Sequence, residues 1–277
     1  FPNALEACAL QPHERRSSRI SGDVTKYGRS PWIDGFSKSR VPSYPKFRGR
    51  GNSDVVIVGG GLTGCATAYA LGAAGVKVVV LEADQLGRGA SGASTGWIGD
   101  DPGVGFVELE KAIGLRPARS AWQAWHRAGL DFAALLRRLK VQCALEPRGG
   151  TSAALSPEQA TRLKREQQAR KTAGLLAPLL NARTISGDVG FPAFAGIRVR
   201  DGAAIDPYRA ALGLAAAAVQ RGARLFEHSP AVRITFGRRA VDVHRNRGMD
   251  GFQLNGRRQP RRAFLQLGVR AIARERL

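Results

Sequence analysis

Several residue types are scarce in this 277-residue sequence, and each shortage excludes a class of protein. The three cysteines, Cys8, Cys65 and Cys143, lie far apart and match neither a disulfide framework nor a metal-ligand spacing. We expect isolated thiols in a reducing compartment and no metal site. No run reaches the roughly 18 to 20 apolar residues of a membrane span, and the first residues show no apolar run of the secretory kind. These absences predict a cytoplasmic protein without a membrane partner.

Histidine is also scarce, and the sequence shows no arrangement in which it would act as a catalyst. The four histidines are scattered, and each is expected on a surface or a helix face; they are His13, His126, His228 and His244. A nucleophile needs a nearby base that a third group orients, and no such Ser-His-Asp pattern is present. The sequence therefore nominates no catalytic residue.

Acidic residues are few relative to basic ones: 22 Asp and Glu stand against 43 Lys and Arg, a net charge of +21. Such a charge is typical of nucleic-acid-binding proteins. However, residues 1–53 carry ten basic and four acidic side chains, and residues 238–277 carry eleven and three, so the two ends supply most of the excess. The basic residues are not interleaved with stacking aromatic residues. We therefore do not expect a nucleic-acid partner, although a basic nucleic-acid-binding protein stays an alternative.

Methionine occurs once, at Met249, so a chain that begins at Phe1 contains no plausible initiator. We expect an N-terminus that is processed or incomplete, or a translation assigned from an upstream point. Residues 1–53 are rich in Ser, Pro and Arg without a sustained period, which predicts a largely irregular arm. The aromatic residues available to pin parts of this arm to a surface are Trp32, Phe36 and Tyr44.

A regular pattern begins at residue 54, in a chain with enough apolar residues for a sizeable core. The apolar run 55–58 is typical of a strand buried on both faces. Small residues over 62–74 are compatible with a helix, and Gly75 follows as its stop. The run 76–81 then predicts the next strand. This order of elements indicates a strand-helix-strand unit.

Later segments repeat the alternation of helices and strands. Large apolar residues recur at helical spacing over 118–140, among them Trp122 and Trp125, which predicts a core-facing amphipathic helix. The capping box SPEQ at 156–159 predicts the start of a polar helix that ends at Gly174.

The last predicted helix begins with Asp206 as its cap and Pro207 as its first residue, and ends at Gly222. Residues 223–226 and 232–236 then predict strands. Because strands alternate with helices, we predict an α/β fold with a parallel sheet and helical crossovers.

Three glycines, Gly59, Gly61 and Gly64, follow the first predicted strand with the spacing G-x-G-x-x-G, and Glu82 ends the next strand. The glycines allow a tight turn, close approach of a pyrophosphate and close packing of the helix on the sheet. The amides and dipole at the helix start attract phosphate, and Glu82 is placed to accept hydrogen bonds from ribose hydroxyls. This pattern predicts a dinucleotide site for a cofactor without a 2′-phosphate; a glycine-rich turn without a ligand is the alternative.

The stretch EADQLGRGASGASTGWIGDD, residues 82–101, bears on which dinucleotide binds. A nicotinamide-binding unit usually proceeds to another crossover helix, whereas this segment is long and rich in Gly, Ser, Ala and Thr. Its small side chains and free amides are able to line an extended pyrophosphate and ring system, which favours FAD. A flexible loop in an NAD-dependent dehydrogenase is the alternative.

At this point the sequence resembles the D-amino-acid-oxidase-like FAD-dependent oxidoreductases, which include glycine oxidase, sarcosine oxidase and gamma-glutamylputrescine oxidase. The matching stretches are VVIVGGGLTGCATAYALGAAGVKVVVLEAD, GRGASGASTGWI and RDGAAIDPYRAALGLAAAAVQRGARLFEHSPAVRIT. They run across residues 54–236, about two thirds of the chain. The resemblance implies a Rossmann-like FAD-binding fold with a parallel sheet, plus part of a mixed α+β substrate domain.

The resemblance also implies a set of cofactor-binding residues. Those at the diphosphate and the adenosine ribose are Gly59, Gly60, Gly61, Leu62, Thr63, Gly64, Glu82 and Ala83. Those along the pyrophosphate are Arg88, Ala90 and Ser91, and those near the flavin ring are Thr95, Gly96 and Trp97. Val232 matches a strand position whose backbone reaches toward the adenine. The pairs Asp201-Gly202 and Asp206-Pro207 are interpreted as structural.

The implied reaction is the oxidation of a C–N bond in an amino acid or amine. A hydride passes to flavin N5, the imine hydrolyses, and oxygen or another acceptor reoxidises the flavin, because the cofactor carries the redox chemistry. The implied division is an arm at 1–53, an FAD-binding unit and pyrophosphate loop at 54–110, a partial substrate region at 111–200, a return to the FAD domain at 201–243, and a basic tail at 244–277.

Beyond about Val243 the family pattern is no longer recognisable. Residues 238–277 have eleven arginines and no lysine, from which we hypothesise that the C-terminal stretch is translated out of frame. A chain without the second half of the substrate domain is expected to bind FAD weakly, to aggregate through an exposed sheet edge and to show little or no turnover.

Overall fold

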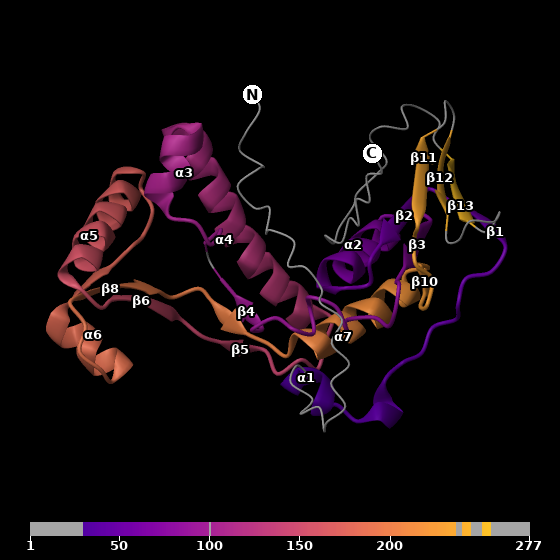
Figure 1. Ribbon diagram of the computed structural model, residues 1–277, viewed down its shortest axis with the longest axis horizontal. Helices are drawn as coiled ribbons and strands as arrows, with labels where there is room; N and C mark the ends of the chain where they lie inside the picture. The colour runs from indigo at the N-terminus through magenta and orange to yellow at the C-terminus, as the bar shows by residue number, and fades with distance from the viewer. Residues whose placement is uncertain (1–29, 100, 237–239, 245–250, 256–277) are drawn as a thin grey trace, which may run out of the picture.

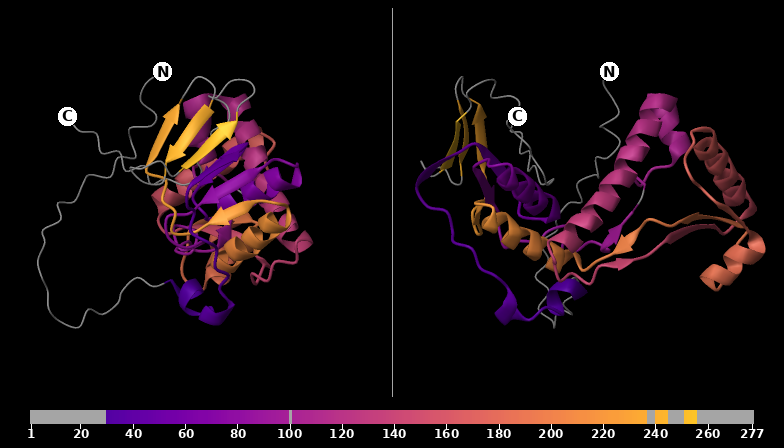
Figure 2. Two further views of the ribbon diagram at one scale, coloured as in Figure 1. Left: turned by 90° about the vertical axis from the view of Figure 1, so that its right-hand side faces the viewer. Right: turned by 180° about the vertical axis from the view of Figure 1, so that it is seen from behind.

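The computed structural model describes residues 30–99, 101–236, 240–244 and 251–255. These residues form an elongated molecule with two lobes, which a long helix and several strands connect (Figures 1 and 2). No helix among the described residues is long and apolar enough to cross a membrane.

The first lobe is built on a parallel sheet of three strands: β2 (Val55–Val58), β3 (Val78–Leu81) and β10 (Arg224–Phe226). Their order is β10-β3-β2, so β3 lies in the centre, and all four of its side chains are buried. A strand that is covered on both faces has no polar side to present to water, which explains its unbroken apolar sequence.

Two helices, α2 (Leu62–Ala73) and α7 (Pro207–Gln220), pack against each other and against the sheet. Both consist mainly of small residues, which permits this close approach. Asp206 caps α7 by accepting a hydrogen bond from Arg209 N at 3.0 Å, and Pro207 is the first residue of the helix. This confirms the prediction that Asp206 is a helix cap.

A second sheet contains β1 (Arg50–Ser53), β11 (Arg233–Phe236), β12 (Ala240–His244) and β13 (Gly251–Asn255), in the order β1-β13-β12-β11. Strands β11 to β13 are antiparallel, whereas β1 pairs with β13 in parallel. Phe47, Val56, Val79, Leu81 and Val243 form the apolar cluster between the parallel sheet and this part of the chain.

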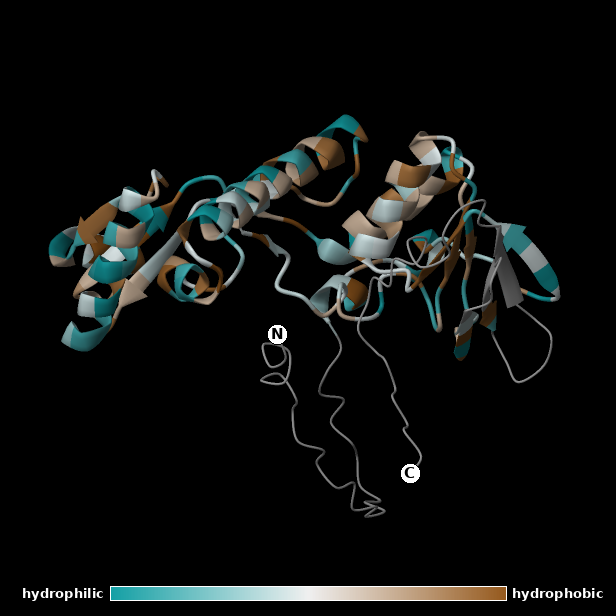
Figure 3. Ribbon diagram, turned by 90° about the horizontal axis from the view of Figure 1, so that it is seen from above, coloured by the Kyte–Doolittle hydropathy of each residue, from teal (hydrophilic) through white to brown (hydrophobic). Residues whose placement is uncertain are grey.

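The second lobe contains α3 (Phe106–Ile113), α5 (Pro157–Thr172), α6 (Ala182–Val189) and a sheet of β6 (Gly150–Ala154), β8 (Ala195–Val199) and β7 (Leu179–Asn181). Helix α4 (Leu115–Arg138) runs from this lobe to the first, beside the small sheet of β4 (Trp97–Ile98), β9 (Ala203–Ala204) and β5 (Glu146–Pro147) (Figure 1). The end of the molecule that holds α5 is mainly hydrophilic, whereas the strands of the parallel sheet are hydrophobic (Figure 3).

The predicted fold class is confirmed, and most predicted elements are present close to their expected limits. The helix predicted over 62–74 is α2, the helix predicted over 118–140 is α4, and Ser156 caps α5 by accepting from Gln159 N. Parallel pairing is less extensive than the alternation of elements indicated. Both sheets that contain β4 to β9 are antiparallel: β9 pairs with β4 and β5, and β8 pairs with β6 and β7.

Two strands lie in segments that the sequence assigned to an irregular arm and a basic tail. Strand β1 occupies the end of the predicted arm, and β13 lies within the predicted basic tail at 244–277. The sequence RGNS of β1 contains no β-branched or aromatic residue, so its strand conformation arises from pairing with β13 rather than from local propensity. Residues 256–277, which hold most of the tail, lie outside the described residues.

Candidate functional site

The glycine loop between β2 and α2 is shaped by two close approaches of the backbone. Gly59 has φ +105°, a conformation that side chains rarely adopt. A Cβ atom on Gly64 would lie 2.0 Å from the carbonyl oxygen of Gly59. Any larger residue at Gly64 would push α2 away from the loop. The turn and the close packing that the glycine spacing predicts are therefore both present.

The first turn of α2 lies directly beside this loop. Gly61 is the N-cap residue and has no side chain with which to satisfy the first amides of the helix. One of them, Leu62 N, donates to Ser91 Oγ at 2.9 Å. The unpaired amides and the dipole of a helix N-terminus attract anions. Ser91 thus brings the segment 86–97 to the positive end of α2.

Glu82 follows the last residue of β3 and connects the strand to the glycine loop. Its Oε2 accepts a hydrogen bond from Gly60 N at 2.7 Å, and its Oε1 accepts one from Asp84 N at 2.9 Å. Each carboxylate oxygen has further acceptor capacity. The half-buried carboxylate of Glu82 is therefore held rigidly and keeps the ability to accept from hydroxyl groups of a ligand.

Cys65 lies in the first turns of α2 and is completely buried. Burial, together with the charge of Glu82, raises the pKa of its thiol to about 12. Its Sγ donates weakly to Gly60 O at 3.6 Å. The thiol is therefore neutral and serves in packing, and Cys143 is likewise buried and free.

The structure brings most of the predicted residues to one edge of the parallel sheet. Gly87 N donates to Gly60 O at 2.9 Å, so the segment returns to the glycine loop. Ser229 N donates to Glu82 O at 2.8 Å, which places the chain leading to Val232 beside the same loop. Val232 is 58% exposed and immediately precedes β11. The predicted residues with exposed side chains are Thr63, Ala83, Arg88, Ala90, Thr95 and Trp97.

A cavity of about 570 Å³ opens beside α2 and β4. Its lining includes four predicted residues, Leu62, Thr63, Gly96 and Trp97. The remaining lining residues are Ala66, Ser94, Ile98, Gly99, Trp125, Ala128, Gly129, Phe132, Ile205 and Pro207. None of the lining residues carries a charged side chain. The cavity is apolar with aromatic walls, which is typical of sites for flat organic ligands.

Helix α4 contributes a wall that the sequence did not predict. Trp125 was expected to face the core, but it is 51% exposed and lines the cavity, whereas Trp122 is buried in a cluster with Phe106. The small residues Ala128 and Gly129 follow Trp125 on this wall. A helix whose apolar stripe contains small residues beside a large aromatic one is the signal that would have indicated a cavity.

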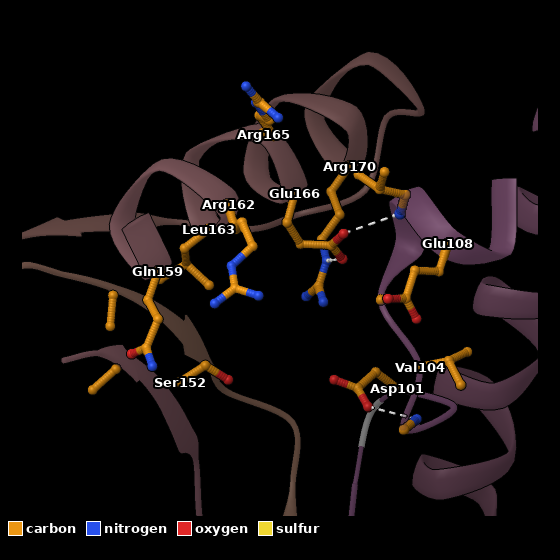
Figure 4. Close-up of a pocket in the computed structure, with 15 residues that line it drawn as sticks. Asp101, Val104, Glu108, Ser152, Gln159, Arg162, Leu163, Arg165, Glu166 and Arg170 are labelled. Atoms are coloured by element: carbon orange, nitrogen blue, oxygen red, sulfur yellow. Dashed lines mark hydrogen bonds and ion pairs between the residues drawn. The ribbon is translucent and has the colours of Figure 1, made fainter. Parts of the chain in front are cut away.

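A second cavity, of about 750 Å³, lies between α3, α5 and β6 (Figure 4). Its most buried charges are engaged in holding the helices together. The Glu166 carboxylate accepts from Phe106 N at 2.6 Å and Val107 N at 3.0 Å, and it pairs with Arg170 Nε at 2.7 Å. Glu166 therefore caps α3 from α5. This cavity shares no lining residue with the glycine loop or with the apolar cavity.

His126 and Asp201, to which the sequence analysis gave no catalytic or binding role, contact each other. His126 is a partly exposed residue of α4, and its Nε2 lies 3.0 Å from the Oδ2 of Asp201. Neither residue lines the apolar cavity. His126 therefore matches the expectation of a helix-face histidine, and Asp201 matches the expectation of a structural residue.

Comparison with known proteins identifies a family whose sequence model matches most of the chain. A sequence model described as "DAO: FAD dependent oxidoreductase" matches residues 54–255, which extends beyond Val243, where the sequence pattern was expected to end. Gamma-glutamylputrescine oxidoreductase of Escherichia coli (strain K12) is 31% identical over 183 residues, 65% of this chain and 43% of that protein. The chain spans half or less of the length of the curated relatives it matches first, at 43%, 40% and 50%.

Solved structures share the fold. Glycine oxidase from Bacillus cereus ATCC 14579 is similar with a TM-score of 0.55 at 20% identity, over 73% of this chain and 53% of that chain. L-alpha-glycerophosphate oxidase from Mycoplasma pneumoniae, solved with FAD bound, is similar with a TM-score of 0.55 at 19% identity, over 74% and 52%.

Proposed function

The chain belongs to the DAO family of FAD-dependent oxidoreductases, and from this premise we propose that its glycine loop, Glu82 and the segment 86–97 bind FAD for the oxidation of a C–N bond in an amine or amino acid. The membership confirms the resemblance seen in the sequence and makes FAD, rather than NAD, the cofactor. The substrate class follows the relatives, whose names include gamma-glutamylputrescine oxidoreductase and glycine oxidase.

One observation carries the assignment of the site: the start of α2 behind Gly61, the anchored carboxylate of Glu82 and the apolar cavity lie along one edge of the sheet. The Gly61 N-cap leaves helix amides for a diphosphate. Glu82 is held by Gly60 N and Asp84 N, and its remaining acceptor capacity suits ribose hydroxyls. These groups fit the diphosphate and ribose of FAD.

The apolar cavity fits the remaining part of the cofactor. Its walls include the indoles of Trp97 and Trp125, and Leu62 and Thr63 join it to the first turn of α2. A flat aromatic ring system gains from contact with such walls. The Trp97 ring itself rests on glycines, since a Cβ on Gly202 would lie 2.7 Å from its Cζ2 atom.

When bound, FAD supplies the acceptor for the hydride that leaves the carbon bearing the amine. The residues of this chain bind and orient the reacting partners and exclude water from the apolar cavity. We assign residues 54–110 and 201–243 to cofactor binding, because α2, β2, β3, α7 and β10 form one lobe, and 111–200 to the substrate side.

Calorimetric titration of the purified chain with FAD and with NAD tests the proposal. FAD is expected to bind more tightly, and Glu82→Gln is expected to weaken FAD binding about tenfold, because one amide oxygen replaces two carboxylate oxygens. Glu158→Gln, at an exposed position of α5, is the matched control and should leave the affinity unchanged. Tighter binding of NAD, or unchanged FAD affinity in Glu82→Gln, would contradict the assignment.

A further inference from the structure

The part of the predicted arm that the structure describes ahead of β1 is residues 30–49. It lies outside the region that matches the family, which begins at residue 54. It nevertheless packs on the cofactor lobe. Ser30 caps the short helix α1 (Pro31–Asp34) by accepting from Trp32 N, and α1 lies against α7 (Figure 1). These contacts indicate that the arm contributes to the structure of the cofactor lobe.

The first contact is made by Trp32 and Ile33. Trp32 Nε1 donates to the carbonyl oxygen of Ser94 at 2.9 Å. Ile33 fills the space beside Gly92: a Cβ on Gly92 would lie 3.0 Å from Ile33 Cδ1 and 2.5 Å from Gly87 O. Gly92 is thus enclosed between the arm and the start of its own loop.

The second contact runs through Phe36. Its ring meets that of Tyr208 edge to face, with centroids 5.7 Å apart and planes at 84°. Tyr208 is 1% exposed and packs against Gly87, where a Cβ would lie 3.0 Å from the Tyr208 ring. The guanidinium of Arg209 lies over the Phe36 ring, 5.4 Å from its centroid. Phe36 therefore supports the tyrosine that supports Gly87.

The third contact is a carboxylate shared by the arm and the loop. Glu227 is 3% exposed; its Oε2 accepts from Tyr44 N at 3.0 Å and its Oε1 from Leu86 N at 2.8 Å. Ser229 Oγ accepts from Phe47 N at 2.9 Å close by. A buried carboxylate is costly unless its oxygens are satisfied. Glu227 therefore holds the arm and Leu86 at a fixed distance from each other.

All three contacts reach residues 86–94, which form turns and bends without a helix or strand. The position of such a segment depends on its tertiary contacts. It contains Ser91, which bonds the start of α2, and the predicted pyrophosphate residues Arg88 and Ala90. Holding a binding segment in its bound conformation increases affinity because less ordering remains to be done on binding.

We propose that the arm is a positioning element for the FAD diphosphate segment 86–94, with Trp32 as its principal positioning residue. The inference rests on the proposed function, because it takes this segment to contact FAD. It assigns a positioning role to residues that precede the region that matches the family.

The test compares Trp32→Phe with Trp122→Phe in the full chain, well below the unfolding temperature. Both variants lose an indole, but Trp122 lies in the cluster with Phe106. Trp32→Phe removes the donor to Ser94 and is expected to weaken FAD binding about fivefold and to speed hydrogen exchange in 86–94, with exchange in β3 unchanged. Trp122→Phe should change neither. Glu227→Gln, which satisfies only one of two amides, is the second variant and should act as Trp32→Phe does.

Equal FAD affinity in wild type, Trp32→Phe and Glu227→Gln would overturn the inference, whether or not hydrogen exchange changes, because the arm would then not serve the cofactor. A wild-type chain that binds no FAD would instead overturn the proposed function, and this inference with it. A lower FAD affinity without faster hydrogen exchange in 86–94 would also contradict the proposal, because the substitution would then not act on FAD binding through this segment.

Discussion

Ser91 Oγ accepts a hydrogen bond from Leu62 N at 2.9 Å, so a loop residue reaches the first turn of α2. This bond joins the two parts of the candidate site, the glycine loop and the small-residue segment that follows β3. The helix start is thereby partly satisfied from outside the helix.

Replacement of Ser91 by Ala should destabilise the protein. Leu62 N would lose its partner, and loss of a helix-end hydrogen bond typically costs about 1 kcal/mol. The free energy of unfolding, measured by urea denaturation without FAD, is expected to fall by about this amount. Ser152→Ala, on an exposed part of β6, is the control. Equal stability of Ser91→Ala and wild type would show that water replaces the hydroxyl at no cost.

Gly64→Ala should have a larger effect. The new methyl group would lie 2.0 Å from the carbonyl oxygen of Gly59, and backbone at this distance has to move. We expect a loss of about 2–4 kcal/mol in unfolding free energy and a loss of FAD binding.

Gly187→Ala is the matched control, because it lies within α6 and a Cβ there meets nothing within 4 Å. It should be neutral or stabilising by up to about 1 kcal/mol, since Ala is the better helix former. If Gly64→Ala keeps the stability and FAD affinity of wild type, the glycine loop is not as tightly packed as described.

Trp125→Ala separates cofactor contact from core packing. Trp125 is half exposed, so its removal should change the unfolding free energy little, whereas loss of an aromatic wall should weaken FAD binding about tenfold. Trp122→Ala is expected to show the reverse, with lower stability and normal affinity, because Trp122 is buried. Calorimetry and thermal unfolding of both variants distinguish these outcomes; a stability loss in Trp125→Ala without weaker binding would place Trp125 in the core.

The cysteines allow a test that depends on pH. The raised pKa of Cys65, about 12, means that its reactive thiolate is scarce at pH 8 and increases only as the pH approaches 12. Iodoacetamide at pH 8 should therefore leave the Cys65 peptide unmodified in the native chain and modify it after denaturation, as mass spectrometry would show. Rapid labelling of native Cys65 would contradict its burial.

The parts of this fold that the sequence predicted depend on local signals. Gly59 and Gly64 indicate the loop because only glycine fits those positions, and Asp206 with Pro207 indicates a helix start because capping involves neighbouring residues. The position of Glu82 was also predictable, since it follows an apolar strand in the same unit.

The remaining features depend on contacts between distant segments. Helical periodicity places Trp122 and Trp125 on an apolar stripe, but it does not reveal that one faces a cluster and the other a cavity. Glu227 gave no signal, because its role is defined by Tyr44 and Leu86, which are remote in sequence. Aromatic residues in the arm were correctly expected to pin it, although their partners, Ser94 and Tyr208, were not predicted.

The pairing of Arg50 with Gly251 has a consequence for the order of synthesis. Strand β1 leaves the ribosome long before β13 exists, so its edge stays without that neighbour until residues 251–255 have been synthesised. The unit β2-α2-β3, by contrast, is complete as soon as residue 81 has emerged. Non-local pairing is slow compared with local contacts. The nascent chain is therefore expected to form its nucleotide cradle first and to close the second sheet only after residues 251–255 have emerged.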